Sequence, residues 1–382
     1  MSLRAVAVAV LLAPAGAGCS SSSSSGGPAP SHDAGAADAT VRDAGADGGE
    51  DASSPADTGV LDTGIHEAAT EEDAAEDGGC ARADVPDGAC AITLAAGQNA
   101  PAGLAVDSQY VYWTLGIPDG GVFRAPIGGG AASTIASGQA SPLSVAVDAN
   151  HVYWTNSGGT TVMSAPLDGG PPAPILVAPG GPLYIAIDAT AVYVTTSNGS
   201  VLSGPLGGVA DGGAPSVLAT GQGQPSLLAV DDAGVYFTNY TGSASVVSIP
   251  KSGVPEGGAP FVIAAGENLP FGIALDAANV YWTAIGSGSV RTAPKTGVPD
   301  GGSPTVLATG QMTPSGVAVD PANLYFASEI SAGAVLVVPL AGGGAPMPFV
   351  GAQRYANLVV VDPANVYWTD YASNGSVMQV AK

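Results

Sequence analysis

Apolar and small residues recur in one fixed pattern along the C-terminal three quarters of the chain. The unit is an apolar–small–apolar run that ends in Asp, followed by three residues and then by Val-Tyr-aromatic-Thr. Its first copy is Leu104–Asp107 with Val111–Thr114. Short apolar runs that are rich in Val and aromatic residues and are bounded by Asp are typical of β-strands. Each unit therefore predicts two strands joined by a tight turn.

This unit occurs seven times, and its copies begin at Leu104, Val145, Ile185, Leu228, Ile273, Val317 and Val359. Each period of about 42 residues also holds a third and a fourth apolar run, such as Gly121–Ile127 and Val217–Ala219. Four strands in about 40–45 residues is the size of one propeller blade. We therefore expect an all-β, seven-bladed β-propeller with four antiparallel strands per blade over residues 91–382. A six-bladed ring is the alternative.

The two ends of the repeat array predict how the ring closes. A lone run of the fourth type, Ile92–Ala95, precedes the first unit, whereas the last unit ends with a third-type run, Ser376–Val380. We expect the N-terminal strand to complete the last blade, because this removes two unpaired sheet edges at once.

The repeat resembles the YWTD propeller repeat of the low-density lipoprotein receptor family. Val366–Asp370 reads Val-Tyr-Trp-Thr-Asp, and Leu104–Asp107 supplies the Ala-Val-Asp that precedes such a strand. Two features depart from the family: the Asp that ends the motif occurs only at Asp370, and family propellers usually have six blades. The resemblance implies a propeller fold and carries no activity across.

The N-terminus has the pattern of an export signal followed by a tether. Arg4 precedes an apolar run over 5–13, and the segment 1–19 ends in Gly-Ala-Gly-Cys19, which resembles a bacterial lipoprotein signal. We expect a lipid on Cys19, which would anchor the chain to a membrane as an outer-membrane or cell-surface lipoprotein. Gly16 stands where such signals prefer Leu, so a periplasmic or secreted protein, with Cys19 removed or free, is the alternative.

Residues 20–79 are rich in Ala, Asp, Gly and Ser and have no aromatic residue. They cannot bury enough apolar surface to fold, so we expect a disordered acidic tether. Cys80 and Cys90 then bound a short junction, residues 80–90. In an exported protein we expect these two cysteines to form a disulfide, because a zinc site would need four ligands.

The composition excludes several classes of function. The net charge is −23 and the pI about 4.1, with no cluster of Lys or Arg, so nucleic acid is not an expected partner. His151 is the single histidine of the predicted propeller, and no Gly-x-Ser-x-Gly motif occurs. We expect no metal, no cofactor and no catalytic residue. The repeated Asp is interpreted as a turn residue and not as a ring of metal ligands.

The candidate binding face is formed by the loops that enter each first strand and leave each second strand. Its recurrent polar residues and its residues outside the consensus are Gln98, Gln139, Gln222, Glu267, Gln311, Glu329, Gln353, Arg354, Tyr355, Tyr240 and Tyr371. We expect a noncatalytic module that binds protein or glycan at the cell envelope, because Tyr and Arg anchor interfaces. The alternative is a metal-dependent lactonase or lyase that uses Glu267, Glu329, Asp370 and Asp119 at the channel mouth. Satisfaction of loop backbone groups is the competing interpretation for the Gln residues.

Overall fold

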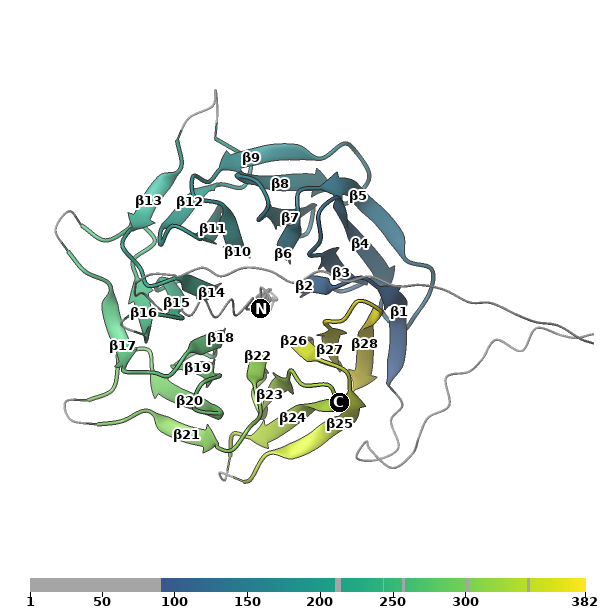
Figure 1. Ribbon diagram of the computed structural model, residues 1–382. Coiled ribbons are helices and arrows are strands. Elements are labelled where there is room, and N and C mark those ends of the chain that lie inside the picture. The colour runs from purple at the N-terminus through teal and green to yellow at the C-terminus, as the bar shows by residue number, and fades with distance from the viewer. Residues whose placement is uncertain (1–90, 210–213, 243, 256–257, 300–301, 342–343) are drawn as a thin grey trace, which may run out of the picture. The chain divides into compact units, whose positions relative to one another are not determined.

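The structure is a computed structural model that describes residues 91–209, 214–242, 244–255, 258–299, 302–341 and 344–382. Its regular structure consists of seven four-stranded antiparallel sheets set around a ring (Figure 1). The prediction of a seven-bladed propeller is therefore confirmed, and the six-bladed alternative is wrong. The predicted signal, tether, Cys19 lipid and Cys80–Cys90 disulfide lie outside the described residues.

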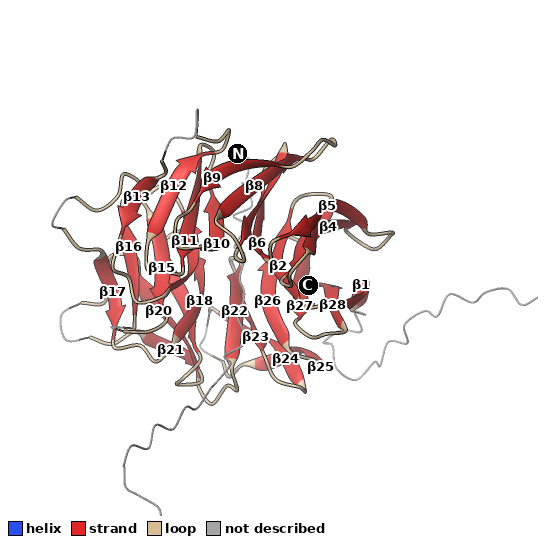
Figure 2. Cartoon of the chain, turned by 45° about the horizontal axis from the view of Figure 1, so that its top comes forward, coloured by secondary structure: helices blue, strands red, loops and turns tan. Residues whose placement is uncertain are grey.

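Each blade begins with an inner strand beside the ring axis. These strands are β2 (Pro101–Val106), β6 (Pro142–Val147), β10 (Pro182–Ile187), β14 (Pro225–Val230), β18 (Pro270–Leu275), β22 (Pro314–Val319) and β26 (Ala356–Val361). Inner strands of successive blades, such as β22 and β26, stand side by side (Figure 2). The second strands, which carry the Val-Tyr-aromatic-Thr motif, are β3 (Tyr110–Leu115), β7 (His151–Asn156), β11 (Ala191–Thr196), β15 (Val235–Asn239), β19 (Asn279–Ala284), β23 (Asn323–Ser328) and β27 (Asn365–Asp370).

The third strands are β4 (Gly120–Pro126), β8 (Thr161–Pro166), β12 (Val201–Pro205), β16 (Ser245–Ile249), β20 (Ser289–Pro294), β24 (Gly333–Pro339) and β28 (Gly375–Ala381). The outer strands are β5 (Ser133–Gln139), β9 (Ala173–Val177), β13 (Ser216–Ala219), β17 (Phe261–Ala265), β21 (Thr305–Ala308), β25 (Met347–Gln353) and β1 (Ile92–Gln98). We number the blades 1 to 7 in chain order from β2, so that blade 7 contains β26, β27, β28 and β1.

The Tyr and the Trp of the second strand face opposite sides of their sheet. In blade 1, Ala105 and Tyr112 are cross-strand partners, and they pack against Val145 and Trp154 of blade 2. Tyr153 of blade 2 packs in turn against blade 3. A small Ala beside the axis and a large Tyr farther out fill a space that widens with radius. Both faces of each sheet are thereby buried, which explains why the inner strands are apolar at almost every position.

A threonine at the end of the second strand links neighbouring blades. Thr114 Oγ1 accepts a hydrogen bond from the N–H of Gly103 at 2.8 Å and donates to the carbonyl of Leu143 in blade 2 at 3.0 Å. Equivalent donations join later blades, for example from Thr283 to the carbonyl of Ser315 at 2.7 Å. Blade 6 has Ala327 at this position, and there the Ser315 hydroxyl donates to the carbonyl of Asn357 instead, at 2.9 Å.

The chain enters every inner strand through the same strained turn. The residue before the strand has a positive φ, as at Ala100 (53°) and Tyr355 (57°), and a one-residue bulge follows, between Pro101 and Leu104 in blade 1. The turn directs the carbonyl of that residue toward the loop after the second strand. There it accepts the N–H of the first loop residue, for example from Glu329 to Thr313 at 3.0 Å. The two loops that form the channel mouth are thereby fixed to one another.

The ring closes as the sequence predicts. β1 pairs antiparallel with β28, with Ile92 opposite Gln379 and Thr93 opposite Met378 (Figure 1). The first described strand thus becomes the outer strand of the last blade. On β1, Leu94 is 5% exposed whereas Ile92 is 39% exposed.

Leu94→Ala should lower the free energy of unfolding by about 2–4 kcal/mol, because it leaves a cavity under the closing strand. Ile92→Ala is the matched control on the same strand and should cost less than about 1 kcal/mol, since its side chain is already partly in water. Equilibrium denaturation in urea measures both. Equal losses of stability in the two variants would contradict the idea that β1 stabilises the ring through its buried side chain.

Candidate functional site

The loops of the propeller lie on two opposite faces, because the strands of each blade alternate in direction. The turns between inner and second strands and those between third and outer strands form one face, called here the turn face. The loops from second to third strands and from each outer strand to the next inner strand form the other, called the mouth face. The predicted binding residues all belong to the mouth face.

The repeated Asp of the turn face is a structural residue. Asp107 Oδ1 accepts the N–H groups of Gln109 and Tyr110, both at 2.7 Å, and Oδ2 accepts the Tyr112 hydroxyl at 2.7 Å. The two backbone bonds recur in every blade, at Asp148, Asp188, Asp231, Asp276, Asp320 and Asp362. The interpretation of these carboxylates as turn residues is confirmed.

Most of the recurrent Gln residues of the mouth face lie at or just after the end of an outer strand and bind an indole or an amide of the following blade. The indole N–H donates to Gln98 from Trp113 at 2.9 Å, to Gln139 from Trp154 at 3.0 Å and to Gln353 from Trp368 at 2.9 Å. In blade 4, where Phe237 replaces the Trp, Asn239 Nδ2 donates to Gln222 at 3.1 Å. Each of these Gln residues also donates to the carbonyl two residues before it. The donations to backbone carbonyls are those that the competing interpretation expects, whereas the contacts with the indoles and the amide were not predicted.

Glu267 occupies the Gln position in blade 5, and both of its carboxylate oxygens have partners. The Trp282 indole donates to Oε2 at 2.9 Å, and Arg291 on β20 binds Oε1 at 3.2 Å. The residue is 4% exposed. Arg291 thus balances the charge introduced where other blades have an uncharged Gln.

The remaining predicted residues fall into two groups, one farther from the ring axis and one nearer to it. Gln311 donates to the carbonyl of Thr309, and blade 6 has Phe326 in place of a Trp, so no indole reaches its Oε1. Arg354 and Tyr355 lie exposed in the loop between β25 and β26. Tyr240, Glu329 and Tyr371 lie nearer the axis and belong to one cluster with three further residues.

This group, called the mouth cluster, consists of Tyr184, Tyr240, Phe271, Glu329, Asn357 and Tyr371. Asn357 Nδ2 donates to Glu329 Oε2 at 2.8 Å. The Phe271 ring meets Tyr184 and Tyr240 edge-on, with ring centroids 6.4 and 6.2 Å apart. Tyr184 and Phe271 come from blades 3 and 5, which are not adjacent in the ring. The cluster therefore gathers side chains from several blades at the axis.

Two backbone features place these six side chains. Tyr240, Glu329 and Tyr371 each follow a second strand, and the N–H of each is held by the carbonyl before the inner strand. The other three residues lie in the bulged part of an inner strand, between its first residue and the next regular pair. Tyr184, Phe271 and Asn357 were not predicted as site residues from the sequence. Their signal was the variation at these positions, where other blades have Ala, Leu, Ser or Gly.

The carboxyl of Glu329 is poorly solvated. Burial raises the pKa of Glu329 to about 7, and the hydrogen bond from Asn357 only partly offsets this. Burial also raises the pKa of Tyr240 and Tyr371, and the negative charge of Glu329 raises both further. All the phenols of the cluster are therefore neutral at pH 7, whereas Glu329 exchanges its proton near neutrality.

Asp370 is a second carboxyl on the mouth face whose pKa is raised. Burial raises it to about 6, against the hydrogen bond from Ser376 and the charge of Arg354. Oδ2 accepts the Ser376 hydroxyl at 2.7 Å, while the buried Oδ1 has no partner among the described residues. Asp119, the fourth acid of the enzymatic alternative, lies exposed just before β4.

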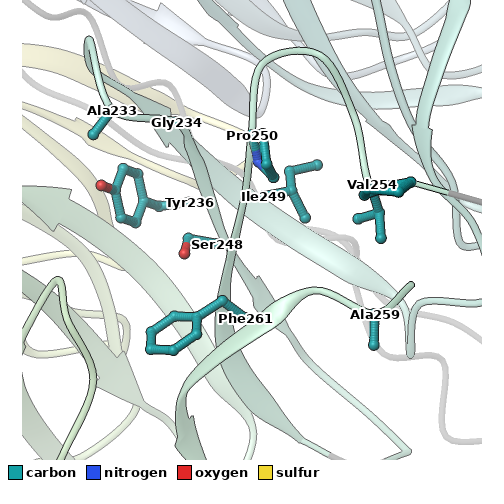
Figure 3. Close-up of a pocket in the computed structure, with 10 residues that line it drawn as sticks. Ala233, Gly234, Tyr236, Ser248, Ile249, Pro250, Val254, Ala259 and Phe261 are labelled. Carbon is teal, nitrogen blue, oxygen red and sulfur yellow. The ribbon is translucent and has the colours of Figure 1, made fainter.

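A separate cavity of about 320 Å³ lies away from the mouth, at the edge of blade 4 (Figure 3). Tyr236, Pro250, Val254 and Phe261 are among the residues that line it. It has one titratable side chain, Tyr236, and its other lining residues are apolar or small. The cavity contains none of the predicted binding residues.

The described residues contain no group of three His, Cys, Asp or Glu side chains placed to hold a metal ion. They also contain no helix long and apolar enough to cross a membrane. His151 begins β7 on the turn face, and its ring lies 6.0 Å from that of Tyr153.

Comparison with known proteins finds similarity in fold. The chain matches no known family profile and no curated protein sequence. A solved structure of streptogramin B lyase superposes with a TM-score of 0.62 at 11% identity, over 76% of this chain and 97% of that one. An inactive histidine-to-alanine variant of virginiamycin B lyase from Staphylococcus aureus, with quinupristin, gives 0.60 at 12%, over 76% and 98%. A nidogen–laminin complex gives 0.49 at 21%, over 62% and 91%.

Glu329→Gln should stabilise the protein at pH 8 by on the order of 1–3 kcal/mol, with the gain shrinking toward pH 5. The folded state binds the Glu329 proton more tightly than the unfolded chain, whose value is near 4.5. Wild-type stability contributed by this group is therefore fully present below pH 4.5 and is lost as the pH rises through 7. Urea denaturation at several pH values measures this, and Asp232→Asn, an exposed change on the turn face, is the control. A constant difference between pH 5 and pH 8 would contradict the raised pKa.

Proposed function

We propose that this propeller is a noncatalytic binding module of the cell envelope that takes a protein or glycan ligand at its mouth face. The mouth cluster carries this proposal. It gathers aromatic rings, a carboxyl and an amide at the end of the axis, where propellers offer their concave surface. The other recurrent polar groups are engaged within and between the blades: the turn-face Asp residues in turns, the Gln side chains largely with Trp or Asn of the following blade, and Glu267 with Arg291.

The attachment of the module is a proposal that rests on the sequence. A lipid on Cys19 and a tether of about 60 residues would hold the propeller near the membrane, at a root-mean-square distance of about 45 Å that like charges along the tether would increase. We also infer that the repeat is related to the YWTD repeat, because Val366–Asp370 matches that motif literally. Diacylglycerol on Cys19, detected by intact mass, supports the anchor, and a free Cys19 or a chain cleaved after it contradicts it.

One observation favours the enzymatic alternative, a metal-dependent lactonase or lyase. Burial raises the pKa of Glu329 to about 7 and that of Asp370 to about 6, and carboxyls whose pKa is raised toward neutrality can donate and accept protons in catalysis. Such an enzyme needs several free acids around its metal, and Glu267 already binds Trp282 and Arg291. A binding role does not require Glu267 to leave Trp282 and Arg291.

Tyr371→Ala should weaken ligand binding about tenfold, because Tyr371 is an aromatic anchor of the mouth cluster. The full chain is tested against arrayed polysaccharides and arrayed envelope proteins by biolayer interferometry. Phe261→Ser, at an exposed position on the distant cavity, is the matched control and should leave binding unchanged.

Loss of binding in Phe261→Ser but not in Tyr371→Ala would show that the ligand binds at the cavity of blade 4, and would overturn the proposal. A thermal shift specific to one divalent metal, abolished by Glu329→Gln and accompanied by lactone turnover, would favour the enzyme instead.

A further inference from the structure

Two hydrogen-bond acceptors of the mouth cluster have no donor among the described residues. Asn357 is fully buried. Its Nδ2 donates a hydrogen bond to Glu329 Oε2, but its Oδ1 has no partner among the described residues. No described residue donates to Glu329 Oε1. A buried acceptor without a donor costs about 1–3 kcal/mol, so the cluster is complementary to a ligand that brings hydrogen-bond donors.

The carboxyl of Glu329 also lacks a cation. The propeller has six basic side chains, and each lies elsewhere. Lys251, Lys295 and Lys382 pair with turn-face Asp residues, and Arg291 pairs with Glu267. Arg124 donates to the carbonyl of Leu167, and the charge of the exposed Arg354 acts on Asp370. Glu329 is thus the acid of the mouth cluster whose charge no side chain of the propeller balances.

Aromatic side chains lie in the same cluster as this carboxyl. Burial raises the pKa of Tyr184, Tyr240 and Tyr371, and the negative charge of Glu329 raises each of these pKa values further. The faces of aromatic rings attract cations through their quadrupole, and this attraction is strongest where water is excluded. Rings around an unpaired carboxyl favour a positively charged guest over a neutral one.

We propose that the mouth cluster binds a primary ammonium group, and that this group belongs to a lysine side chain of a protein partner. An ammonium group has three N–H donors. Two of them can satisfy Glu329 Oε1 and Asn357 Oδ1, while its charge lies among the rings. This inference rests on the proposed binding function and specifies its ligand.

Two features favour a protein lysine as the source of the ammonium. At the mouth face the four acids Asp119, Glu267, Glu329 and Asp370 outnumber the two cations Arg291 and Arg354, and this excess of negative charge favours a basic partner. Beside the cluster, Met312 and Tyr355 are 65% and 37% exposed. They offer apolar surface for the methylene chain that separates the lysine charge from its backbone.

The experiment titrates the full chain with Nα-acetyl-lysine methylamide and follows binding by calorimetry. Two matched probes accompany it: the Nε-acetyl form, which is neutral, and the Nε-trimethyl form, which is charged but has no N–H. Lysine should bind, the acetyl form should show no binding, and the trimethyl form should bind about tenfold more weakly, because it cannot donate to the two acceptors. Glu329→Gln should weaken lysine binding about tenfold, and Asp232→Asn should not.

The pH dependence tests the same geometry. The groups that act on Glu329 are Asn357, which does not titrate, and the phenols of the cluster, whose pKa values are raised by burial and which therefore stay neutral between pH 6 and pH 8. With a pKa of about 7 for Glu329, lysine affinity should rise about tenfold from pH 6 to pH 8. This rise should disappear in Glu329→Gln.

Equal binding of the lysine and acetyl probes, or unchanged binding in Glu329→Gln, overturns the ammonium site. Equal binding of the trimethyl probe overturns the role of the two acceptors. If no lysine probe binds while an arrayed glycan or protein still binds through Tyr371, this inference fails and the proposed function stands. If arrayed ligands bind independently of Tyr371, the proposed function fails as well.

Discussion

The face-to-face packing of neighbouring blades is the constraint on which this propeller depends. A four-stranded sheet that is apolar on both faces is stable only between two other sheets, so no blade can be completed by itself. The Tyr face of one blade packs against the Trp face of the next, and the threonine links join their inner strands. The pairing of β1 with β28 closes this series, and without it blade 7 would expose the edge of β28.

Most of the residues that recur from blade to blade serve the structure and packing of the blades. The Asp that ends each inner strand closes a turn, the Thr bridges to the next blade, and the Gln before each inner strand accepts an indole or amide where the blade provides one. Side chains that have none of these structural roles occur at positions where the blades differ. Glu329, Asn357 and Tyr184 are such positions, and none of them carries a repeat interaction of its side chain.

The strained entry to each inner strand connects the scaffold to the site. Positive φ at a residue such as Thr313 or Tyr355 directs a carbonyl toward the loop opposite, which fixes the first residue of that loop at the mouth. Non-glycine residues adopt this conformation at a cost that the surrounding structure must offset. Loop residues held by these hydrogen bonds have less conformational entropy left to lose on binding a ligand.

The sequence by itself determined the four strands of each blade and predicted seven blades and the closing strand, because these follow from a repeated pattern of apolar residues and turns, and the structure decided against six blades. It also determined that the repeated Asp serves the turns, because its spacing to the next strand is local. It identified Tyr240, Glu329 and Tyr371 as unusual loop residues. Their neighbours Tyr184, Phe271 and Asn357 lie up to about 190 residues away in the chain. Only the closed ring decided which of these side chains meet at the axis, and that Glu267 is paired while Glu329 is not, because both depend on contacts between strands and blades distant in sequence.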